Sequence, residues 1–471
     1  MKCSNAQEHL TVSINSNIIE GIFERLQQSF GLGKTRTYEW RKAQLDALQR
    51  LLTENESALL AALQKDLGKS ASEAYTTEIG FLLSDIRHTK KHLRKWMKAE
   101  KVSTPIVAQP GRSFIQPEPL GTVLIIGAWN YPLQLTLAPY IAALAAGNCA
   151  ILKPSELAPA SAAVMTSLIP KYLDGDAVKV IEGNKDVATE LLTLPFDHIF
   201  YTGGETVGKI VMQAAAKNLT PVTLELGGKS PCVVDADTDM ATTARRIVWG
   251  KWTNAGQTCI APDYVLVERS CTSSFIARLE YEIHRQFGAQ PATSGDYGQI
   301  INARHLERLQ GYLHGQDVII GGESEPGSLT MVPTVILNPD IESPVMQEEI
   351  FGPVLPVIEV SSISEALDFI KRRAKPLAAY LFSEKPAMQQ KMVEEISAGS
   401  ICINDTMMFM ANPALPFGGV GRSGMGRYHG HFGFNTFSHH KSVMKRSFWF
   451  DVALRYAPSS AKKRFLLKKL L

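Results

Sequence analysis

One of the six cysteines in the chain lies in a sequence context that suits covalent chemistry. Cys259 lies in the segment WTNAGQTCIAPD, among Gly, Gln, Thr and Asn residues. A nucleophilic thiol needs partial exposure and nearby hydrogen-bond donors that stabilise negative charge. Cys149 and Cys402 instead lie in apolar runs that are typical of buried, unreactive cysteines. Cys259 is therefore the candidate nucleophile, and a purely structural cysteine is the alternative.

Two other polar residues interrupt apolar runs and could assist such a nucleophile. Glu225 lies in VTLELGGKS, just before a Gly-Gly pair. Burial would raise the pKa of its carboxyl group and suit it to general-base work, whereas the alternative is an edge-strand glutamate that faces water. Asn130 ends the run IIGAWNYP, where its amide could donate to a developing oxyanion. The alternative for Asn130 is a simple turn before Pro132.

Two glycine-rich segments resemble a phosphate-binding P-loop, but neither completes the motif. The segment GGETVGK at 203–209 is followed by Ile210, where a nucleoside triphosphatase needs a hydroxyl group for Mg²⁺. The segment GGKS at 227–230 has that hydroxyl, but Thr223 occupies the first glycine position. Residues 203–208 nevertheless end a strand-like run and open a helix. They predict a phosphate site at the helix N-terminus, with an ordinary strand–helix turn as the alternative.

A third glycine-rich segment, residues 419–424, formally matches G-x-G-x-x-G. No apolar strand precedes it and no helical pattern follows, so the context of a Rossmann fingerprint is missing. We therefore do not assign a dinucleotide site there.

The elements that must position these residues follow an alternating pattern. Apolar residues in 15–100 recur at the spacing of a helix, with a stop at Gly68. The Pro-rich stretch TPIVAQPGRSFIQPEP that follows breaks any helix. From GTVLIIGA onward, short apolar runs alternate with helix-length segments. A second such series predicts a helix near 238–252, a strand near 263–268 and a helix near 271–287. This pattern predicts an α/β fold built from βαβ units with parallel sheets.

Composition narrows the class of protein. With 471 residues, 45% hydrophobic and 20% charged, the chain can bury a large core across about three domains. A formal charge of +3 gives no field that would hold nucleic acid non-specifically. The scattered cysteines, Cys3 among them, indicate free thiols in a reducing compartment. Since MKCSNAQEHL lacks a signal-peptide core and no clean apolar run reaches about 18 residues, we expect a cytoplasmic protein.

Seven segments together resemble the aldehyde dehydrogenase superfamily. They are GAWNYP, ILKPSE, YTGGETVG, LELGGKSP, GQTC, EEIFGP and PFGG, in this order along essentially the whole chain. The run LPFGGVGRSGMGRYHGHFGFNTFSH resembles the class 3 branch, which handles fatty and aromatic aldehydes. The resemblance implies a Rossmann-variant dinucleotide domain (1–98 and 119–225), a catalytic α/β domain (226–411) and a small bridging β element (99–118 and 412–450). A basic amphipathic tail (451–471) would follow.

The same resemblance implies a role for each candidate residue. Cys259 would be the nucleophile, Glu225 the general base, and Asn130 with the Cys259 backbone N–H the oxyanion hole. A nicotinamide cofactor would be held by Lys153, Glu156, Gly203, Gly204, Glu205, Thr206, Val207, Gly208, Glu349 and Phe351. Lys153 and Glu156 would hold the adenosine ribose, and residues 203–208 would hold the pyrophosphate. Glu349 and Phe351 would lie at the nicotinamide end.

The implied reaction is oxidation of an aldehyde, medium- or long-chain aliphatic or aromatic, to the carboxylic acid with NAD or NADP in a homodimer. Glu156 would repel a 2′-phosphate and so favours NAD, although class 3 relatives often accept both. A CoA-acylating or phosphorylating semialdehyde dehydrogenase is a rival that has little use for the base Glu225. A non-catalytic lens-type protein of the same fold is a second alternative. The presence of Cys259, Glu225 and Asn130 argues against it. No metal is required.

Charge is concentrated at the end of the chain. From Lys441 onward there are nine basic residues and one acidic residue, against 40 basic and 45 acidic in the remainder. The last segment, SSAKKRFLLKKLL, predicts a helix with Phe465 and four leucines on one side. Such a helix is about 20 Å long, too short to cross a bilayer, but it could lie on an anionic membrane surface. The alternative is a solvated or dimer-packed C-terminal helix.

Overall fold

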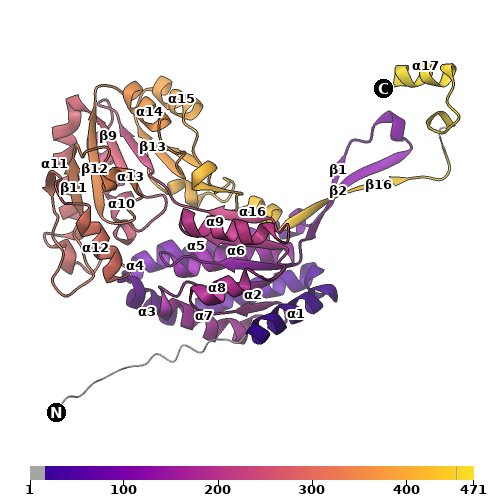
Figure 1. Cartoon of the computed structure of the whole chain (residues 1–471), viewed down its shortest axis with the longest axis horizontal. Helices are drawn as coiled ribbons and strands as arrows, with labels where there is room; N and C mark the ends of the chain where they lie inside the picture. The colour runs from indigo at the N-terminus through magenta and orange to yellow at the C-terminus, as the bar shows by residue number, and fades with distance from the viewer. Residues whose placement is uncertain (1–15, 452, 471) are drawn as a thin grey trace, which may run out of the picture.

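Three β-sheets and the helices around them organise the computed structural model, which describes residues 16–451 and 453–470 (Figure 1). The expectations about the N-terminal segment, including the free thiol of Cys3, lie outside the described residues. The same holds for Val452 and Leu471 of the tail.

A layer of helices opens the described chain, as the spacing in residues 15–100 predicted. It consists of α1 (Ser16–Gly31), α2 (Tyr38–Glu54), α3 (Glu56–Leu67), α4 (Ala71–Ala74) and α5 (Gly80–Trp96). Thr37 caps α2 through its side chain, and α3 ends at Gly68 with a left-handed φ of 65°. Between α4 and α5 lies a π-helical turn, Tyr75–Ile79, so that the two helices run on without a break.

The first sheet carries the order β15-β7-β6-β3-β4-β5, and every pairing except that of β15 is parallel. Its strands are β3 (Thr122–Ile126), β4 (Cys149–Lys153), β5 (Val178–Val180), β6 (His198–Thr202), β7 (Val222–Glu225) and β15 (Gly424–Met425). The crossover helices are α6 (Pro132–Ala146), α7 (Pro159–Tyr172), α8 (Lys185–Leu191) and α9 (Glu205–Ala216). Strand β3 and helix α6 are buried along their whole length, which explains their apolar sequences.

The second sheet has the order β10-β11-β12-β9-β8-β13-β14, with β10 antiparallel and the rest parallel. Its strands are β8 (Pro231–Val234), β9 (Tyr264–Glu268), β10 (Val318–Ile320), β11 (Thr334–Leu337), β12 (Val354–Val360), β13 (Ala378–Phe382) and β14 (Ser400–Ile403). Its helices are α10 (Met240–Trp252), α11 (Thr272–Phe287), α12 (Ala303–Gly311), α13 (Pro344–Gln347), α14 (Ile363–Lys371) and α15 (Pro386–Glu395). The expected strand near 263–268 and its two flanking helices are confirmed.

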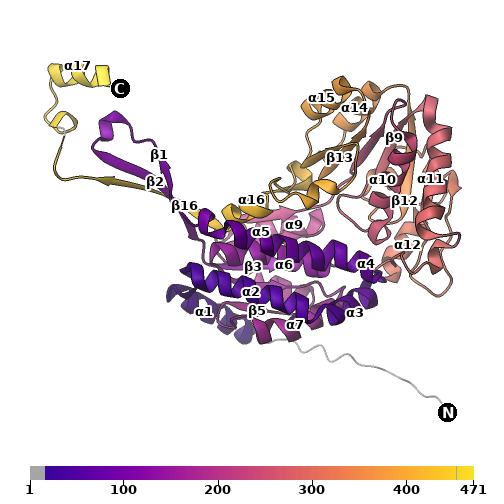
Figure 2. The same cartoon turned by 180° about the vertical axis from the view of Figure 1, so that it is seen from behind.

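A third, antiparallel sheet forms an arm that extends away from both larger sheets (Figures 1 and 2). It contains β1 (Glu100–Val102), β2 (Gly111–Pro119) and β16 (Ser438–Arg446), in that order. The bridging element is thus shorter than the range 412–450 that we expected. Strand β15 instead joins the first sheet beside β7, and α16 (Gly430–Thr436) packs on α5 and α6.

The tail contains the predicted helix, α17 (Ala461–Leu470), but not the predicted apolar side. With 3.6 residues per turn, Lys463 falls between Leu466 and Leu467 around this helix, so basic and apolar side chains interleave. Phe465 falls roughly opposite Leu466 and Leu467, so, contrary to the prediction, it does not share their side of the helix. The amphipathic description of the tail as a whole stays a prediction. Within residues 16–451 and 453–470, no helix is long and apolar enough to span a membrane.

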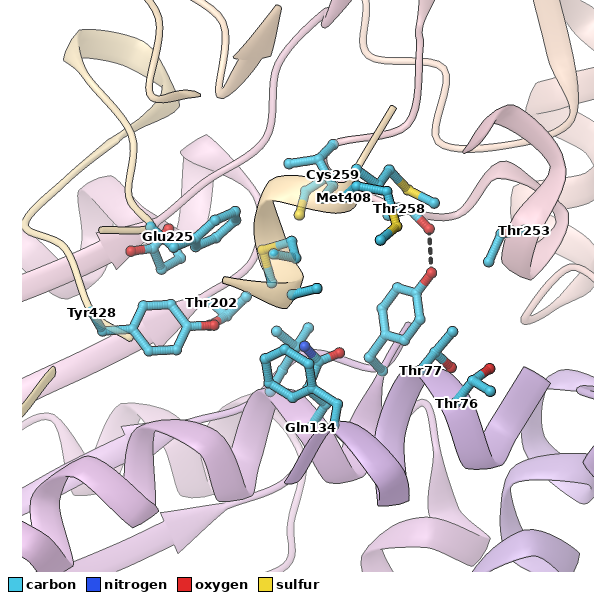
Figure 3. Close-up of a pocket in the computed structure, with 18 of the residues that line it drawn as sticks. Thr76, Thr77, Gln134, Thr202, Glu225, Thr253, Thr258, Cys259, Met408 and Tyr428 are labelled. Atoms are coloured by element: carbon cyan, nitrogen blue, oxygen red, sulfur yellow. Dashed lines mark hydrogen bonds between the residues drawn. The ribbon is translucent and has the colours of Figure 1, made fainter. Parts of the chain in front are cut away.

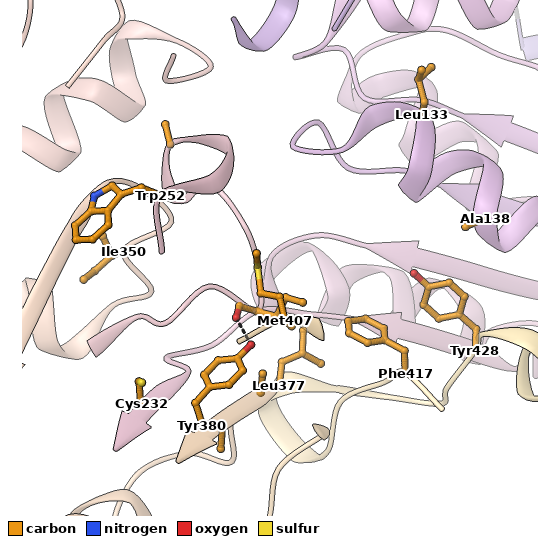
Figure 4. Packing of buried hydrophobic residues seen from close by; sticks show 14 of the residues in the cluster. Leu133, Ala138, Cys232, Trp252, Ile350, Leu377, Tyr380, Met407, Phe417 and Tyr428 are labelled. Atoms are coloured by element: carbon orange, nitrogen blue, oxygen red, sulfur yellow. Dashed lines mark hydrogen bonds between the residues drawn. The ribbon is translucent and has the colours of Figure 1, made fainter. Parts of the chain in front are cut away.

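One buried apolar cluster runs through the first and second sheets and the helices that pack on them (Figure 4). Met407, Phe417 and Tyr428 come from the C-terminal part of the chain and pack there. Tyr380 of β13 donates a hydrogen bond from its hydroxyl to the carbonyl of Ile260 at 2.5 Å. This bond fixes the backbone one residue after Cys259.

Candidate active site

A cavity of about 220 Å³ lies at the junction of the two larger sheets (Figure 3). Cys259 and Glu225 both line it, which brings together two residues that are 34 positions apart in the sequence. Most of the wall is apolar. It includes Phe81, Leu135, Trp249, Ile260, Met407, Met408, Met410 and Phe417.

Cys259 follows a short helical turn, Thr253–Gly256, in which Asn254 and Ala255 have left-handed φ angles of 55° and 50°. This turn places the partly exposed thiol in the cavity wall. Burial raises the pKa of the Cys259 thiol, and the nearby Glu349 and Glu225 carboxylates raise it further, whereas hydrogen bonding from the backbone acts in the opposite direction. These surroundings disfavour the thiolate, which is the form that attacks a carbonyl carbon.

Glu225 ends β7 and is only 3% exposed. Because β15 pairs with the outer side of β7, Glu225 is not an edge residue that faces water. Neither of its carboxylate oxygens has a hydrogen-bond partner within residues 16–451 and 453–470. Desolvation raises the pKa of Glu225 well above its ordinary value. A carboxylate in this setting accepts a proton readily once it is ionised.

Asn130 lies in the buried loop between β3 and α6, as the sequence suggested. Its Nδ2 atom donates to the carbonyl of Gln257 at 3.0 Å. A side-chain amide carries two N–H donors, and within residues 16–451 and 453–470 the second has no acceptor, which leaves it available to an oxyanion. The backbone carbonyl of Asn130 accepts hydrogen bonds from Lys69 Nζ at 3.0 Å and Asn254 Nδ2 at 2.8 Å. Sequence reasoning had singled out neither of these two donors.

The segment after β6 has the backbone geometry of a phosphate site. Gly204 is the N-cap of α9 and offers no side-chain cap, which leaves the N–H groups of the first turn free for an anion. Thr206 and Val207 point to solvent, so their contribution would come from the backbone. A Cβ atom on Gly208 would lie 2.8 Å from Leu226 Cδ2, so a larger residue here would require the Leu226 side chain to move.

The acidic residue in this segment is already engaged by cations. The Glu205 carboxylate contacts Arg422 at 2.8 Å and Lys209 at 2.8 Å. These hydrogen bonds lower the pKa of Glu205 to about 2. Its charge is thereby neutralised near the end of α9 that would receive a phosphate. Gly203, which precedes this turn, donates its N–H to the carbonyl of Glu225 at 3.0 Å and so ties the segment to the base.

The remaining cofactor candidates lie on two other segments. Lys153 ends β4, is almost fully buried, and places Nζ 3.0 Å from Oε2 of the exposed Glu156. Glu349 packs so tightly on Gly227 that a Cβ there would lie 2.0 Å from its Oε2 atom. Burial, and then Asp263, raise the pKa of Glu349 to about 8. Phe351 has a φ of 48° and sets its ring 5.2 Å from that of Trp129.

The four histidines between residues 429 and 440 do not form one site. His429 is buried and stacks on Phe417 with ring centroids 5.4 Å apart, while His431 stacks on Trp96. His439 and His440 are exposed on β16. Within the described part of the chain, no group of three or more His, Cys, Asp or Glu side chains is arranged to hold a metal ion.

Comparison with known proteins agrees with this arrangement. Residues 14–443 match the model of the aldehyde dehydrogenase family. "Aldehyde dehydrogenase family 3 member A2" of Macaca fascicularis is 47% identical over 442 residues, which cover 93% of this chain and 91% of that protein. "Aldehyde dehydrogenase, dimeric NADP-preferring" of Rattus norvegicus is 47% identical over 446 residues, covering 94% and 98%. A solved structure described as the substrate-bound state of Staphylococcus aureus AldH superposes with a TM-score of 0.94 at 45% identity, covering 97% of this chain and all of that one.

The chain belongs to the aldehyde dehydrogenase family. It is an oxidoreductase that oxidises an aldehyde to the carboxylic acid with a nicotinamide dinucleotide, NAD or NADP. The expected fold, with parallel sheets in a mixed α/β arrangement, is confirmed by the structural match.

Proposed function

We propose that this enzyme oxidises hydrophobic aldehydes, either medium- or long-chain aliphatic or aromatic, through a thioester on Cys259. The observation that carries the proposal is the cavity itself, in which a thiol and a buried carboxyl group share a mostly apolar wall. An apolar wall stabilises a bound alkyl chain by about 0.8 kcal/mol for each buried methylene group. Polar or very small aldehydes gain little from such a wall.

The residues divide the reaction into two stages. Cys259 reacts as the thiolate, after its proton has passed to water, and its sulfur adds to the aldehyde carbon to form a thiohemiacetal. The free N–H of the Asn130 amide and the backbone N–H of Cys259 stabilise the oxyanion. After oxidation to the thioester, Glu225 takes a proton from a water molecule that attacks the thioester carbon. The acid then leaves and the thiol is restored.

The residues present fit a nicotinamide dinucleotide. Lys153 and Glu156 would hold the adenosine ribose, the free N–H groups at the start of α9 the pyrophosphate, and Glu349 the nicotinamide ribose. When bound, the cofactor supplies the hydride acceptor for the oxidation. We propose that NAD is favoured because the exposed Glu156 carboxylate would repel the 2′-phosphate of NADP. Fluorescence titration of the enzyme with each cofactor tests this preference, and tighter binding of NADP would contradict it.

A substrate panel tests the central proposal. We expect kcat/KM, followed as absorbance growth at 340 nm, to rise from acetaldehyde through hexanal to decanal, with benzaldehyde and a cinnamyl-type aldehyde also accepted. The gain should be about three- to fourfold for each added methylene that the wall covers. Cys259→Ala enzyme serves as the control for background reduction of cofactor. A maximum at acetaldehyde would contradict the proposal.

We also propose a homodimer. Strand β16 at the rim of the arm and β14 at the rim of the second sheet each have one unpaired side among the described strands. Unpaired strand edges are ready to pair with another chain. One relative at 47% identity carries the word "dimeric" in its name. Light scattering coupled to gel filtration should give twice the chain mass, and a monomer at micromolar concentration would contradict this.

We further propose a cytoplasmic enzyme that makes peripheral contact with membranes through its C-terminal segment. The support is the basic charge of α17 together with aromatic side chains in the preceding segment. Phe448 and Trp449 are almost fully exposed, at 108% and 88%. Exposed aromatic residues beside basic ones favour the interface of an anionic membrane.

A further inference from the structure

A fully buried ion pair lies directly behind the segment that contains Asn130. Lys69 and Glu78 expose none of their side chains, and Lys69 Nζ lies 2.6 Å from Glu78 Oε1. Lys69 follows α3, and Glu78 belongs to the π-helical turn between α4 and α5. Removing two charges from water is unfavourable by several kcal/mol per ion, unless further hydrogen bonds satisfy the pair. Those further bonds all go to residues 130–134.

The pair holds the backbone on both sides of Tyr131. Lys69 Nζ donates to the Asn130 carbonyl at 3.0 Å, and the same ammonium lies 3.9 Å from the centroid of the Tyr131 ring. Glu78 Oε2 accepts hydrogen bonds from the backbone N–H groups of Leu133 at 2.8 Å and Gln134 at 3.2 Å. Glu78 therefore caps the start of α6.

The Asn130 carbonyl also connects the two halves of the site. Its second donor, Asn254 Nδ2, comes from the turn that precedes the nucleophile, and the Asn254 backbone N–H donates to Glu73 Oε1 at 2.8 Å. The Asn130 side chain in turn donates to the carbonyl of Gln257. A shift of the Asn130 backbone would therefore change the direction of its free N–H. A misplacement of about 1 Å can lower a rate by two orders of magnitude.

Side chains of the π-helical turn face both the aldehyde cavity and the interior of the protein. Thr76 and Thr77 line the aldehyde cavity, while Glu78 is turned into the protein toward Lys69 and α6. Single π-helical turns within α-helices occur frequently at functional sites. The cavity wall and the support of the oxyanion segment are thus parts of one continuous turn.

We propose that Lys69 and Glu78 are positioning residues for the oxyanion hole. The buried pair fixes the backbone of residues 130–134 and thereby directs the free amide N–H of Asn130 toward the carbonyl oxygen of the aldehyde. This inference rests on the role proposed above for Asn130. It adds two residues of the helical layer to the machinery that sets the catalytic rate.

The first test compares single and paired substitutions. Lys69→Met or Glu78→Gln alone leaves the partner without its counter-charge, so each should lower the thermal midpoint strongly. The double variant Lys69→Met/Glu78→Gln should recover much of that midpoint. Its kcat per folded enzyme, with the folded fraction counted by NAD⁺ titration, should still fall about 30-fold or more, while the Kd for NAD⁺ changes less than about twofold. An unchanged kcat would overturn the proposal.

Arg41→Met provides a matched control. Arg41 is a buried cation that donates to the carbonyl of Ala145 at 2.9 Å, near the opposite end of α6, and to the carbonyl of Thr35 at 3.1 Å. We expect this variant to lose stability but to keep its kcat per folded enzyme. An equal fall of kcat in Arg41→Met would show that the effect comes from loosening α6 in general, which would also overturn the proposal.

A double-mutant cycle separates this proposal from the one on which it rests. In an Asn130→Ala background, the Lys69→Met/Glu78→Gln pair should change kcat by less than about threefold, because the group that it positions is gone. Equal losses in both backgrounds would show that the pair does not act through Asn130. If Asn130→Ala alone retained wild-type kcat, the oxyanion role itself would fail, and that outcome is visible without the other variants.

Discussion

The hydroxyl of Tyr131 lies 2.6 Å from the hydroxyl of Thr258, across the boundary between the two larger sheets (Figure 3). Tyr131 precedes α6 and follows Asn130, while Thr258 precedes Cys259. Both residues are buried. The bond therefore joins the segment that contains Asn130 to the segment that contains Cys259 through their neighbouring residues.

Replacement of Cys259 by Ala should abolish dehydrogenase activity and leave cofactor binding intact. A covalent mechanism has no alternative route, so kcat should fall more than about a thousandfold. Steady-state rates and NAD⁺ titration measure the two properties. Cys402→Ala, at a half-buried thiol on β14, is the matched control and should stay active. A residual rate above a thousandth in Cys259→Ala would exclude this cysteine as the nucleophile.

Glu225→Gln should spare the first turnover better than later ones. Hydrolysis of the thioester lacks its base, whereas the first addition needs only the thiolate form of Cys259. Rapid mixing should therefore show a burst of NADH close to the enzyme concentration, followed by a stall. A uniform slowing with no burst would instead indicate that Glu225 activates the thiol.

The raised pKa of Glu349 predicts a pH-dependent change in stability. Its carboxyl group has a pKa of about 8 in the folded chain, against an ordinary value of 4.5, so the folded state binds the proton more tightly. Its contribution to the free energy of unfolding is thus fully present below pH 4.5 and is lost as the pH rises through 8. Glu349→Gln removes this dependence, so the variant should gain on the order of 4 kcal/mol relative to wild type between pH 5 and pH 9.

Urea unfolding of the cofactor-free enzyme at several pH values measures this difference. Glu342→Gln is the control, because Glu342 is an exposed residue of the loop that precedes α13. Parallel curves for wild type and Glu349→Gln would show that this carboxyl group is not held protonated by burial.

The C-terminal segment should bind anionic vesicles in a salt-sensitive manner. Each basic residue near an anionic surface contributes roughly 1 kcal/mol, an attraction that salt screens. Sedimentation with phosphatidylserine-containing vesicles should pull down the full chain at low salt and much less at high salt, and neutral vesicles should not. A chain that ends at Pro458 should bind less. Equal sedimentation of the two chains would remove the tail from the proposal.

The candidate site could be predicted where its residues lie in contiguous motifs. Cys259 in GQTC and Glu225 in LELGGK are each marked by their immediate neighbours, and the structure brings both to one cavity. Lys69 and Glu78 carry no such mark, because they lie in helical sequence that contains other lysines and glutamates. Their partners Asn130 and Leu133 are 61 and 55 residues away. Only the folded chain shows these contacts.

The fold, like the site, could be predicted from the sequence only in part. The apolar runs and helix-length segments predicted the parallel sheets because the crossover pattern leaves few other arrangements. Strand β15 could not be predicted, since it consists of a glycine and a methionine with no apolar run around them. The tail could be predicted only in part: the spacing of Leu466 and Leu467 keeps both within one arc of the helix, whereas Phe465 falls roughly opposite them.

Strand β15 also has a consequence for synthesis of the enzyme on the ribosome. Gly424 pairs with Glu225, so the proposed base gains its outer neighbour from a segment made about two hundred residues later. Domains generally fold from the N-terminus as the chain emerges, at about 5–20 residues per second. A nascent chain that already contains Cys259 and Glu225 must therefore wait at least about eight seconds for β15. Until then the base lies at an open sheet edge, and a growing chain should show no aldehyde oxidation before Gly424 and Met425 have been translated.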